Sequence, residues 1–231
     1  MDKEQLKGHI SRPATWMSTG GFRPTQAFTE SWVSRVFVYR ENEVIPLDKS
    51  GQPMFPLFQL CLEGLPFVPD IVKNTRFLTV FLSPELPMGV TPNGQNWLVR
   101  EYGYDEPIMR KELHNPDSWF KPFPLKANLI AQDCPVWDGG GLASGDSDTI
   151  IALEDKGIIS DYHHDFPNHY GHKLGGFPSF CQPGVSMGKG FEFVMQIATD
   201  EKANINIVDS GTVFLAKHPK TGDWNYYCDF Y

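Results

Sequence analysis

The sequence has little cysteine, and its cysteines do not follow the pattern of a metal or redox site. Four occur in 231 residues, and no two form a Cys-x-x-Cys pair. Zinc ribbons and thioredoxin-like motifs are therefore excluded. We expect four free thiols, as in a protein of the reducing cytoplasm. They are Cys61, Cys134, Cys181 and Cys228.

Long apolar runs and excess positive charge are also absent. No run approaches the roughly 18 apolar residues that span a bilayer, and the charged residues 1–7 lack the apolar stretch of a signal peptide. The formal net charge is −8 and the pI about 5.3, whereas general nucleic-acid binders are basic because they neutralise phosphates. We therefore expect a cytoplasmic protein with neither nucleic acid nor membrane as a partner.

The chain is rich in glycine, proline and aromatic side chains. Its 21 glycines and 19 prolines interrupt regular elements, while 41% hydrophobic and 13% aromatic residues supply a core. This composition predicts one domain over residues 1–231. Its expected fold class is α+β, β-rich, with short strands and few short helices.

Apolar and alternating stretches predict seven strands and one helix. We expect irregular structure over 1–30 and mostly loop over 115–145, where prolines and glycines are frequent. The helix is predicted at 146–156, with Asp146 or Ser147 as its cap and Gly157 as its stop. The strands are predicted at 32–39, 54–62, 76–82, 96–102, 191–198, 212–217 and 224–231.

Two parts of the chain echo each other. A buried Gln in 58–60 precedes Thr-Val-Phe-Leu at 79–82, and a Gln in 195–197 precedes the same four residues at 212–215. Such a glutamine must be hydrogen-bonded, because an unpaired buried amide costs roughly 1–3 kcal/mol. The echo predicts two pseudo-repeated strand–loop–strand units. They would occupy 31–115 and 171–231, with 116–170 as an acidic loop and helix segment between them.

Four of the seven histidines lie within ten residues and are candidate metal ligands. Neutral imidazoles bind zinc well. However, Pro167 and Gly171 argue against a helix that would align them, and no zincin motif is present. A polar loop with hydrogen-bonded histidines is the alternative, and no cofactor is expected. The four are His163, His164, His169 and His172.

Two further catalytic or binding patterns are incomplete. Cys181 or Cys134 could pair with His172, but no nucleophile motif surrounds either cysteine. Gly175-Gly176 before Phe-Pro lacks both the Walker and the dinucleotide pattern, and is typical of a tight backbone path. The sequence therefore predicts a protein that is not an enzyme.

Negative charge is concentrated in one segment. Residues 133–165 hold eight acidic residues and one basic residue, Lys156, so nearly all of the net charge of −8 lies there. A calcium loop fits poorly, because Ile151 stands where an EF-hand has glycine. A solvated face is one interpretation, and a surface that docks on a basic partner is the other. The candidate partner-binding residues are Asp133, Trp137, Asp138, Asp146, Asp148, Asp161, Tyr162 and Asp165.

Several motifs together resemble the YwqG-like family of bacterial proteins. They are His-Lys-Leu-Gly-Gly-Phe-Pro at 172–178 with Gln182, the segments 193–197 and 209–211, the aromatic end 224–231, and 53–69 in the first half. The resemblance covers the chain from roughly residue 30. It implies an α+β fold with a duplicated β unit and no established catalytic residues. Some members lie beside polymorphic toxins as candidate immunity proteins. The family's Trp-Gly before Asp-x-Gly is Ile207-Val208 here, so no role of that Trp carries over.

Three hypotheses follow. The first is a non-catalytic immunity protein that occludes the active site or substrate groove of a basic toxin, such as a nuclease. The second is a ligand-binding or metal-binding protein or enzyme, with the histidines, Cys181 and the two glycines around a pocket between the halves. The third is a housekeeping interaction module.

Overall fold

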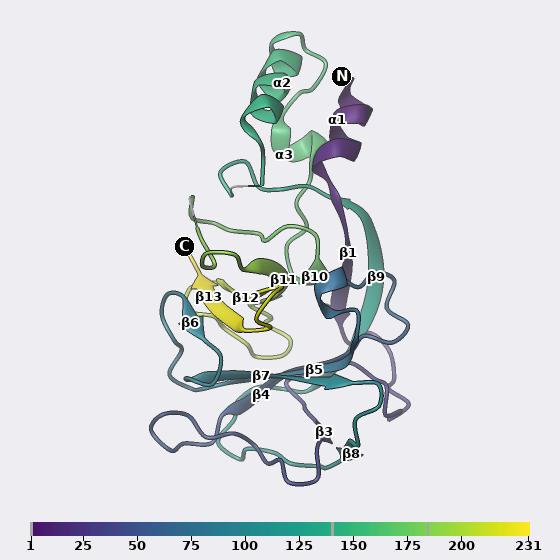
Figure 1. The fold of residues 1–231 in the computed structure, drawn as a ribbon. Helices are drawn as coiled ribbons and strands as arrows, with labels where there is room; N and C mark the ends of the chain where they lie inside the picture. Colours follow the sequence, from purple (N-terminus) through teal and green to yellow (C-terminus); the bar gives the residue numbers. More distant parts are fainter. Residues whose placement is uncertain (1, 140, 184) are drawn as a thin grey trace.

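The computed structural model describes residues 2–139, 141–183 and 185–231. Within them the chain is a β-rich single domain with few short helices (Figure 1). The helical elements are α1 (Lys3–Ile10), the 3-10 turn η1 (Asp70–Val72), α2 (Ser144–Asp155) and α3 (Tyr162–Asp165). The strands are β1 (Arg12–Thr19), β2 (Trp32–Val33), β3 (Val38–Tyr39), β4 (Phe55–Cys61), β5 (Thr75–Leu82), β6 (Thr91–Pro92), β7 (Trp97–Gly103), β8 (Met109–Arg110), β9 (Phe123–Asp133), β10 (His172–Gly175), β11 (Glu192–Ala198), β12 (Thr212–Lys217) and β13 (Trp224–Asp229).

One curled antiparallel sheet organises the described residues. Its eleven strands follow the order β6-β13-β12-β11-β10-β1-β9-β2-β4-β5-β7, and β3 pairs separately with β8. The sheet bends so that β4, β5 and β7 face the strands β10 to β13 (Figure 1). Leu60 and Val80 from one arm therefore share a core with Met195 and Leu215 from the other.

Side chains join the two arms where the curl nearly closes. The rings of Trp97 on β7 and Tyr226 on β13 lie 5.6 Å apart. Beside them the Glu101 carboxylate accepts hydrogen bonds from Lys217 Nζ at 2.8 Å and from Trp224 Nε1 at 2.6 Å. These contacts cover part of the edge that β7 would otherwise expose.

Most apolar runs form the predicted strands. The run over 54–62 becomes β4, which is buried at every position, and the run over 76–82 becomes β5. The predictions for 96–102, 191–198, 212–217 and 224–231 are confirmed by β7, β11, β12 and β13. The predicted helix is confirmed by α2, and Gly157 follows it with a φ of +67°.

The prediction of irregular structure is wrong for two segments. Residues 1–30 contain α1, which a capping box between Asp2 and Gln5 begins, and then β1. Residues 115–145 contain β9, the longest strand, because the prolines lie around its first two residues and beyond its end rather than along it. β1 and β9 pair with each other in the middle of the sheet, so the two strands that the sequence did not predict are central ones.

Three local predictions also differ from the structure. The strand expected at 32–39 is broken by Ser34, whose φ of +61° separates β2 from β3. Helix α2 begins after Ala143 with no side-chain cap, so neither Asp146 nor Ser147 serves as one. His172 to Gly175, for which no strand is predicted, form β10 in the interior of the sheet.

The predicted duplication is not confirmed by the strand registers. Gln59 lies opposite Thr79, whereas Gln196 lies opposite Phe214, so the two echoing pairs differ in register. Both amides are nevertheless satisfied as expected. The Gln59 side chain accepts hydrogen bonds from the backbone of Phe37 and Val38, and that of Gln196 accepts one from Ser179.

Candidate functional site

The three helices form a small unit that stands off one end of the sheet (Figure 1). We call it the acidic projection and define it as α1, α2 and α3 with residues 134–139, 141–143 and 156–161. It has its own apolar core, in which Leu6 and Ile10 of α1 meet Ile150 and Leu153 of α2. Spacings of three and four residues put each pair on one helix face, and this explains why the helices pack together.

Carboxylates dominate the surface of the acidic projection. Residues 2–10 and 134–165 together hold nine acidic residues and three lysines. Seven of the nine acidic residues are exposed and lie outside any ion pair in the described structure. Two of them, Asp2 and Glu4, are in or beside α1. The other five are Asp138, Asp148, Glu154, Asp155 and Asp161. Asp161 also caps α3 by accepting a hydrogen bond from His164 N–H at 3.0 Å.

Helix α1 neutralises part of the predicted patch. Lys3 Nζ lies 2.5 Å from Asp165, whose other oxygen accepts a hydrogen bond from Ser160 N–H at 2.8 Å. The Lys3 ammonium, with the Ser160 bond, lowers the pKa of Asp165 to about 2. His9 Nε2 lies 3.4 Å from Asp146, which is half-buried. Asp146 and Asp165 therefore hold α1 against the rest of the projection.

Asp133 does not belong to the surface patch, which corrects the prediction. It is 0% exposed, and one of its oxygens lies 2.8 Å from Lys173 Nζ, also 0% exposed. Backbone N–H groups of Phe177 and His169 each donate to it at 2.8 Å. Burial lowers the pKa of Lys173, and the neighbouring Asp133 carboxylate opposes that shift. A buried and fully bonded carboxylate cannot meet a partner, so Asp133 fixes the base of the projection instead.

The two aromatic residues predicted to contact a partner, Trp137 and Tyr162, pack against each other instead. Tyr162 is buried, and its hydroxyl donates a hydrogen bond to Pro135 O at 2.7 Å. Trp137 is half-buried with its ring 5.0 Å from that of Tyr162. Two isoleucines are exposed instead, Ile151 at 46% and Ile158 at 52%. Ile151 faces outward because a one-residue step turns it about 100° around the helix axis from the buried Ile150.

The four clustered histidines do not converge. His163 and His164 are exposed on α3, while His169 Nδ1 lies 3.1 Å from Asp133. His172 is buried, with Nε2 at 3.1 Å from Asp200 and Nδ1 accepting from Ala198 N–H. In the described part of the chain, no three His, Cys, Asp or Glu side chains are grouped to hold a metal ion. The geometry gives no support to a metal site here.

The cysteines do not support nucleophilic chemistry either. Burial raises the pKa of both Cys134 and Cys181 to about 11. Since the thiolate is the nucleophile, both groups are protonated and weakly reactive at neutral pH. His172 is bonded to Asp200 and Ala198, so no cysteine hydrogen bond to it is present among the described residues.

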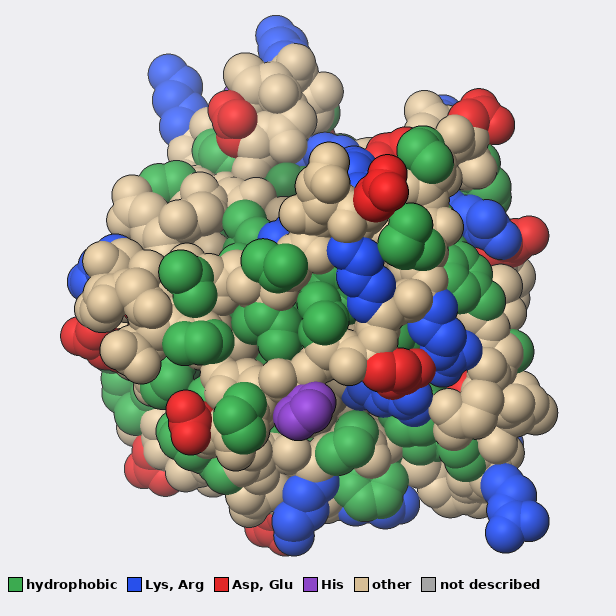
Figure 2. Space-filling view, turned by 90° about the horizontal axis from the view of Figure 1, so that it is seen from below, with side chains coloured by type: hydrophobic (Ala, Val, Ile, Leu, Met, Phe, Trp, Pro, Cys, Tyr) green, Lys and Arg blue, Asp and Glu red, His purple; other side chains and the backbone are tan. Residues whose placement is uncertain are grey.

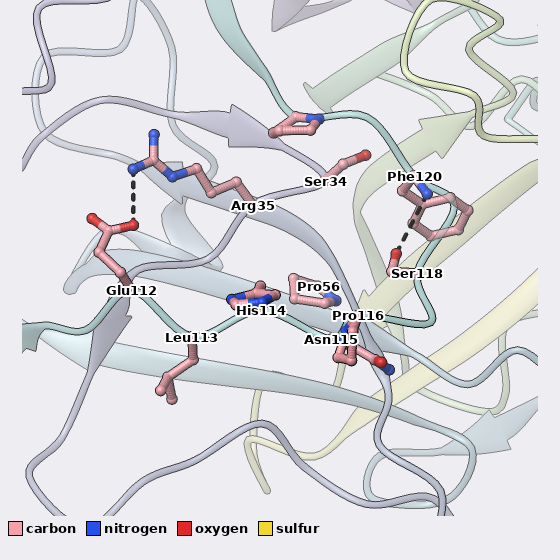
Figure 3. Close-up of a pocket in the computed structure, with 11 residues that line it drawn as sticks. Ser34, Arg35, Pro56, Glu112, Leu113, His114, Asn115, Pro116, Ser118 and Phe120 are labelled. Atoms are coloured by element: carbon pink, nitrogen blue, oxygen red, sulfur yellow. Dashed lines mark hydrogen bonds and ion pairs between the residues drawn. The ribbon is translucent and has the colours of Figure 1, made fainter.

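The far side of the molecule, near β3 and β8, carries a shallow hollow of about 390 Å³. Seen from below, this face gathers hydrophobic side chains in its middle and Lys and Arg side chains to one side (Figure 2). Arg35 in the hollow already pairs with Glu112 at 2.9 Å, and the lining side chains come from several loops (Figure 3). Ser34 Oγ is buried without a partner in the described residues, and no base is bonded to it. This hollow shows no catalytic arrangement.

A larger hollow of about 760 Å³ lies beside Gly175 and Gly176. These two glycines are the only residues of the predicted pocket between the halves that line it. Neither the clustered histidines nor Cys181 is among its described lining residues. The two glycines predicted to line a pocket therefore do border a hollow. The side chains predicted to supply its chemistry, the histidines and Cys181, do not.

Comparisons with known proteins give no family. No protein-family model matches the chain, and no curated protein sequence matches it significantly. The resemblance to the YwqG-like family stays a prediction from the quoted motifs. Among the described residues, no helix combines the length and the apolarity needed to cross a membrane.

Proposed function

We propose that this protein is a non-catalytic, cytoplasmic immunity protein that neutralises a basic toxin domain. The acidic projection docks on the toxin and occludes its active site or substrate groove. One observation carries the proposal: a unit that stands off the sheet bears exposed isoleucines at 151 and 158 together with exposed carboxylates, three of which, Asp148, Glu154 and Asp155, lie on the same helix as Ile151. Specific protein interfaces combine apolar and polar side chains in this way.

The composition of the surface indicates the kind of partner. Asp148, Ile151 and Asp155 follow each other at spacings of three and four residues, so they share one face of α2. A nuclease cleft is lined by lysine and arginine because it must bind phosphate. Carboxylates on α2 would meet those cations, while Ile151 would be buried between them. The expected complex is tight, and its rate of association depends on salt.

The test is co-expression with the protein encoded by the neighbouring gene. Cells are expected to survive only when both proteins are present, and the two should co-purify. Replacing Asp138, Asp148, Glu154 and Asp155 with serine should abolish the protection. These four are chosen because, unlike Asp146 and Asp165, they take part in no described ion pair.

A matched control removes the same charge elsewhere. Glu41, Asp105, Asp117 and Glu201 are exposed and have no described side-chain hydrogen bond, so their serine variants alter net charge equally. The control should protect cells as the unmodified protein does. Equal protection by both fourfold variants would reject the role of the acidic projection.

A further inference from the structure

The curled sheet contains an unfilled strand position next to β10. Pairing between β10 and β11 ends at Leu174 opposite Met195, yet β11 extends back to Glu192. On the other side, Gly176 N–H still donates to Pro13 O at 3.0 Å, so only Arg12 of β1 extends further. The edge of β11 from Glu192 to Val194 therefore lacks a strand partner on the β10 side within the described residues.

Two glycines make the chain leave the sheet at this point. Gly175 and Gly176 have φ values of +79° and +67°, which side chains rarely allow. A Cβ on Gly175 would lie 2.5 Å from the Phe67 ring, and one on Gly176 would lie 2.3 Å from Asp133 Oδ2. The motif at 172–178 thus ends β10 abruptly and leaves the next position open.

The larger hollow, of about 760 Å³, occupies this open position. Its flanks are the strand starts Arg12–Pro13 and Phe191–Phe193, and its end is Gly175–Gly176. Phe67 and Ile71, from the connection between β4 and β5, complete the lining. A hollow bounded by two strands and closed at one end has the shape of a missing strand segment.

The charges at its rim favour a basic occupant. Asp70 and Glu192 are exposed, and neither carboxylate has an ion pair or hydrogen bond in the part of the chain described. Two cations lie nearby. Arg12, the one basic residue of the described lining, lies over the Phe177 ring at 4.3 Å. Lys217, opposite Glu192 in the sheet, is paired with Glu101 at 2.8 Å. Two free carboxylates beside aromatic walls suit lysine or arginine alternating with apolar side chains, because successive side chains of a strand point to opposite faces.

We propose that this position binds an extended peptide segment of another protein as an added strand. The segment continues the path of β10 and pairs with β11 along Glu192 to Val194. It directs apolar side chains toward Phe193 on one face of the sheet and basic ones toward Asp70 and Glu192 on the other. Strand addition supplies affinity through backbone hydrogen bonds and specificity through alternate side chains. This proposal does not depend on the acidic projection.

The experiment uses the full-length protein as the target and selects peptides that bind it from a displayed library of random decapeptides. Enriched peptides are expected to alternate apolar and basic residues. The double variant Asp70→Lys with Glu192→Lys should weaken them about tenfold or more, because two attractive contacts become repulsive. Both side chains are exposed, so an unchanged urea midpoint will show that the variant folds.

Three comparisons make the result decisive. Glu41→Lys with Glu201→Lys, a matched pair of exposed acids, should leave peptide binding unchanged, as should the serine variant of the acidic projection. Bound peptide should also slow amide hydrogen exchange over residues 192–194. The proposal is overturned if no peptide is enriched, or if enriched peptides bind the Asp70/Glu192 variant equally. It is also overturned by a concentration-dependent dimer lost in that variant, which would make a second copy the occupant.

Discussion

Breaking the ion pair between Asp133 and Lys173 should destabilise the protein more than breaking any surface pair. Both side chains are 0% exposed and their charged atoms lie 2.8 Å apart. Removing one partner of such a pair leaves the other charge buried and uncompensated, which costs about 3–5 kcal/mol. Asp133→Asn and Lys173→Met preserve volume, so the loss should come from charge rather than from a cavity.

The measurement is urea and thermal unfolding of both single variants and the double variant. At about 2–4 °C per kcal/mol for a chain of this size, each single variant should lower Tm by roughly 6–20 °C. The double variant should be less destabilised than the two losses added, by about 0.5–3 kcal/mol, because it leaves no orphaned charge.

Arg76→Met provides the control for this prediction. Its guanidinium lies 3.0 Å from a carboxylate, that of Glu63, but the two side chains are 28% and 51% exposed. Solvent screens such a pair, so its loss should cost only about 0–1 kcal/mol. If Asp133→Asn and Lys173→Met cost no more than this control, the assignment of the pair as the anchor of the projection is wrong.

Two further predictions concern the same region. Lys3→Met should raise the pKa of Asp165 from about 2 toward its ordinary 3.8, measured by carboxyl NMR titration. Because that pKa is lowered by folding, the stability from the pair is present above about pH 4 and lost as pH falls toward 2. An unshifted titration in the variant would contradict the contact. Gly176→Ala should cost about 1–3 kcal/mol more than Gly21→Ala in urea unfolding, since both have positive φ but only Gly176 places a Cβ against Asp133. Equal losses would show that backbone strain alone matters.

The strands predicted correctly are those in which periodicity and burial agree. β4 and β5 are continuous apolar runs of seven and eight residues, a length that favours a buried strand over a helix. β9 was missed because its prolines were read as breaks along the segment. They lie near its ends, where a missing backbone N–H has little effect on the ladder.

Charge is visible in the sequence and burial is not. Most acidic residues of 133–165 are exposed, yet Asp133 lies inside the protein and Asp165 is paired with Lys3 from a distant part of the chain. Lys3 and Asp165 are 162 positions apart in the sequence, so no pattern within either segment predicts their contact. One signal was available: Asp2 and Gln5 form a capping box before Leu6 and Ile10, which predicts α1.

The most direct test of the proposed function is the association rate with the toxin domain as a function of ionic strength. Electrostatic steering accelerates association by about 10–1,000-fold, and salt screens it over a Debye length of about 8 Å at 0.15 M. We expect a steep fall in rate with added salt for the unmodified protein and the Glu41/Asp105/Asp117/Glu201 control. The projection variant should associate slowly with a flat salt profile. Identical profiles for all three proteins would contradict the account.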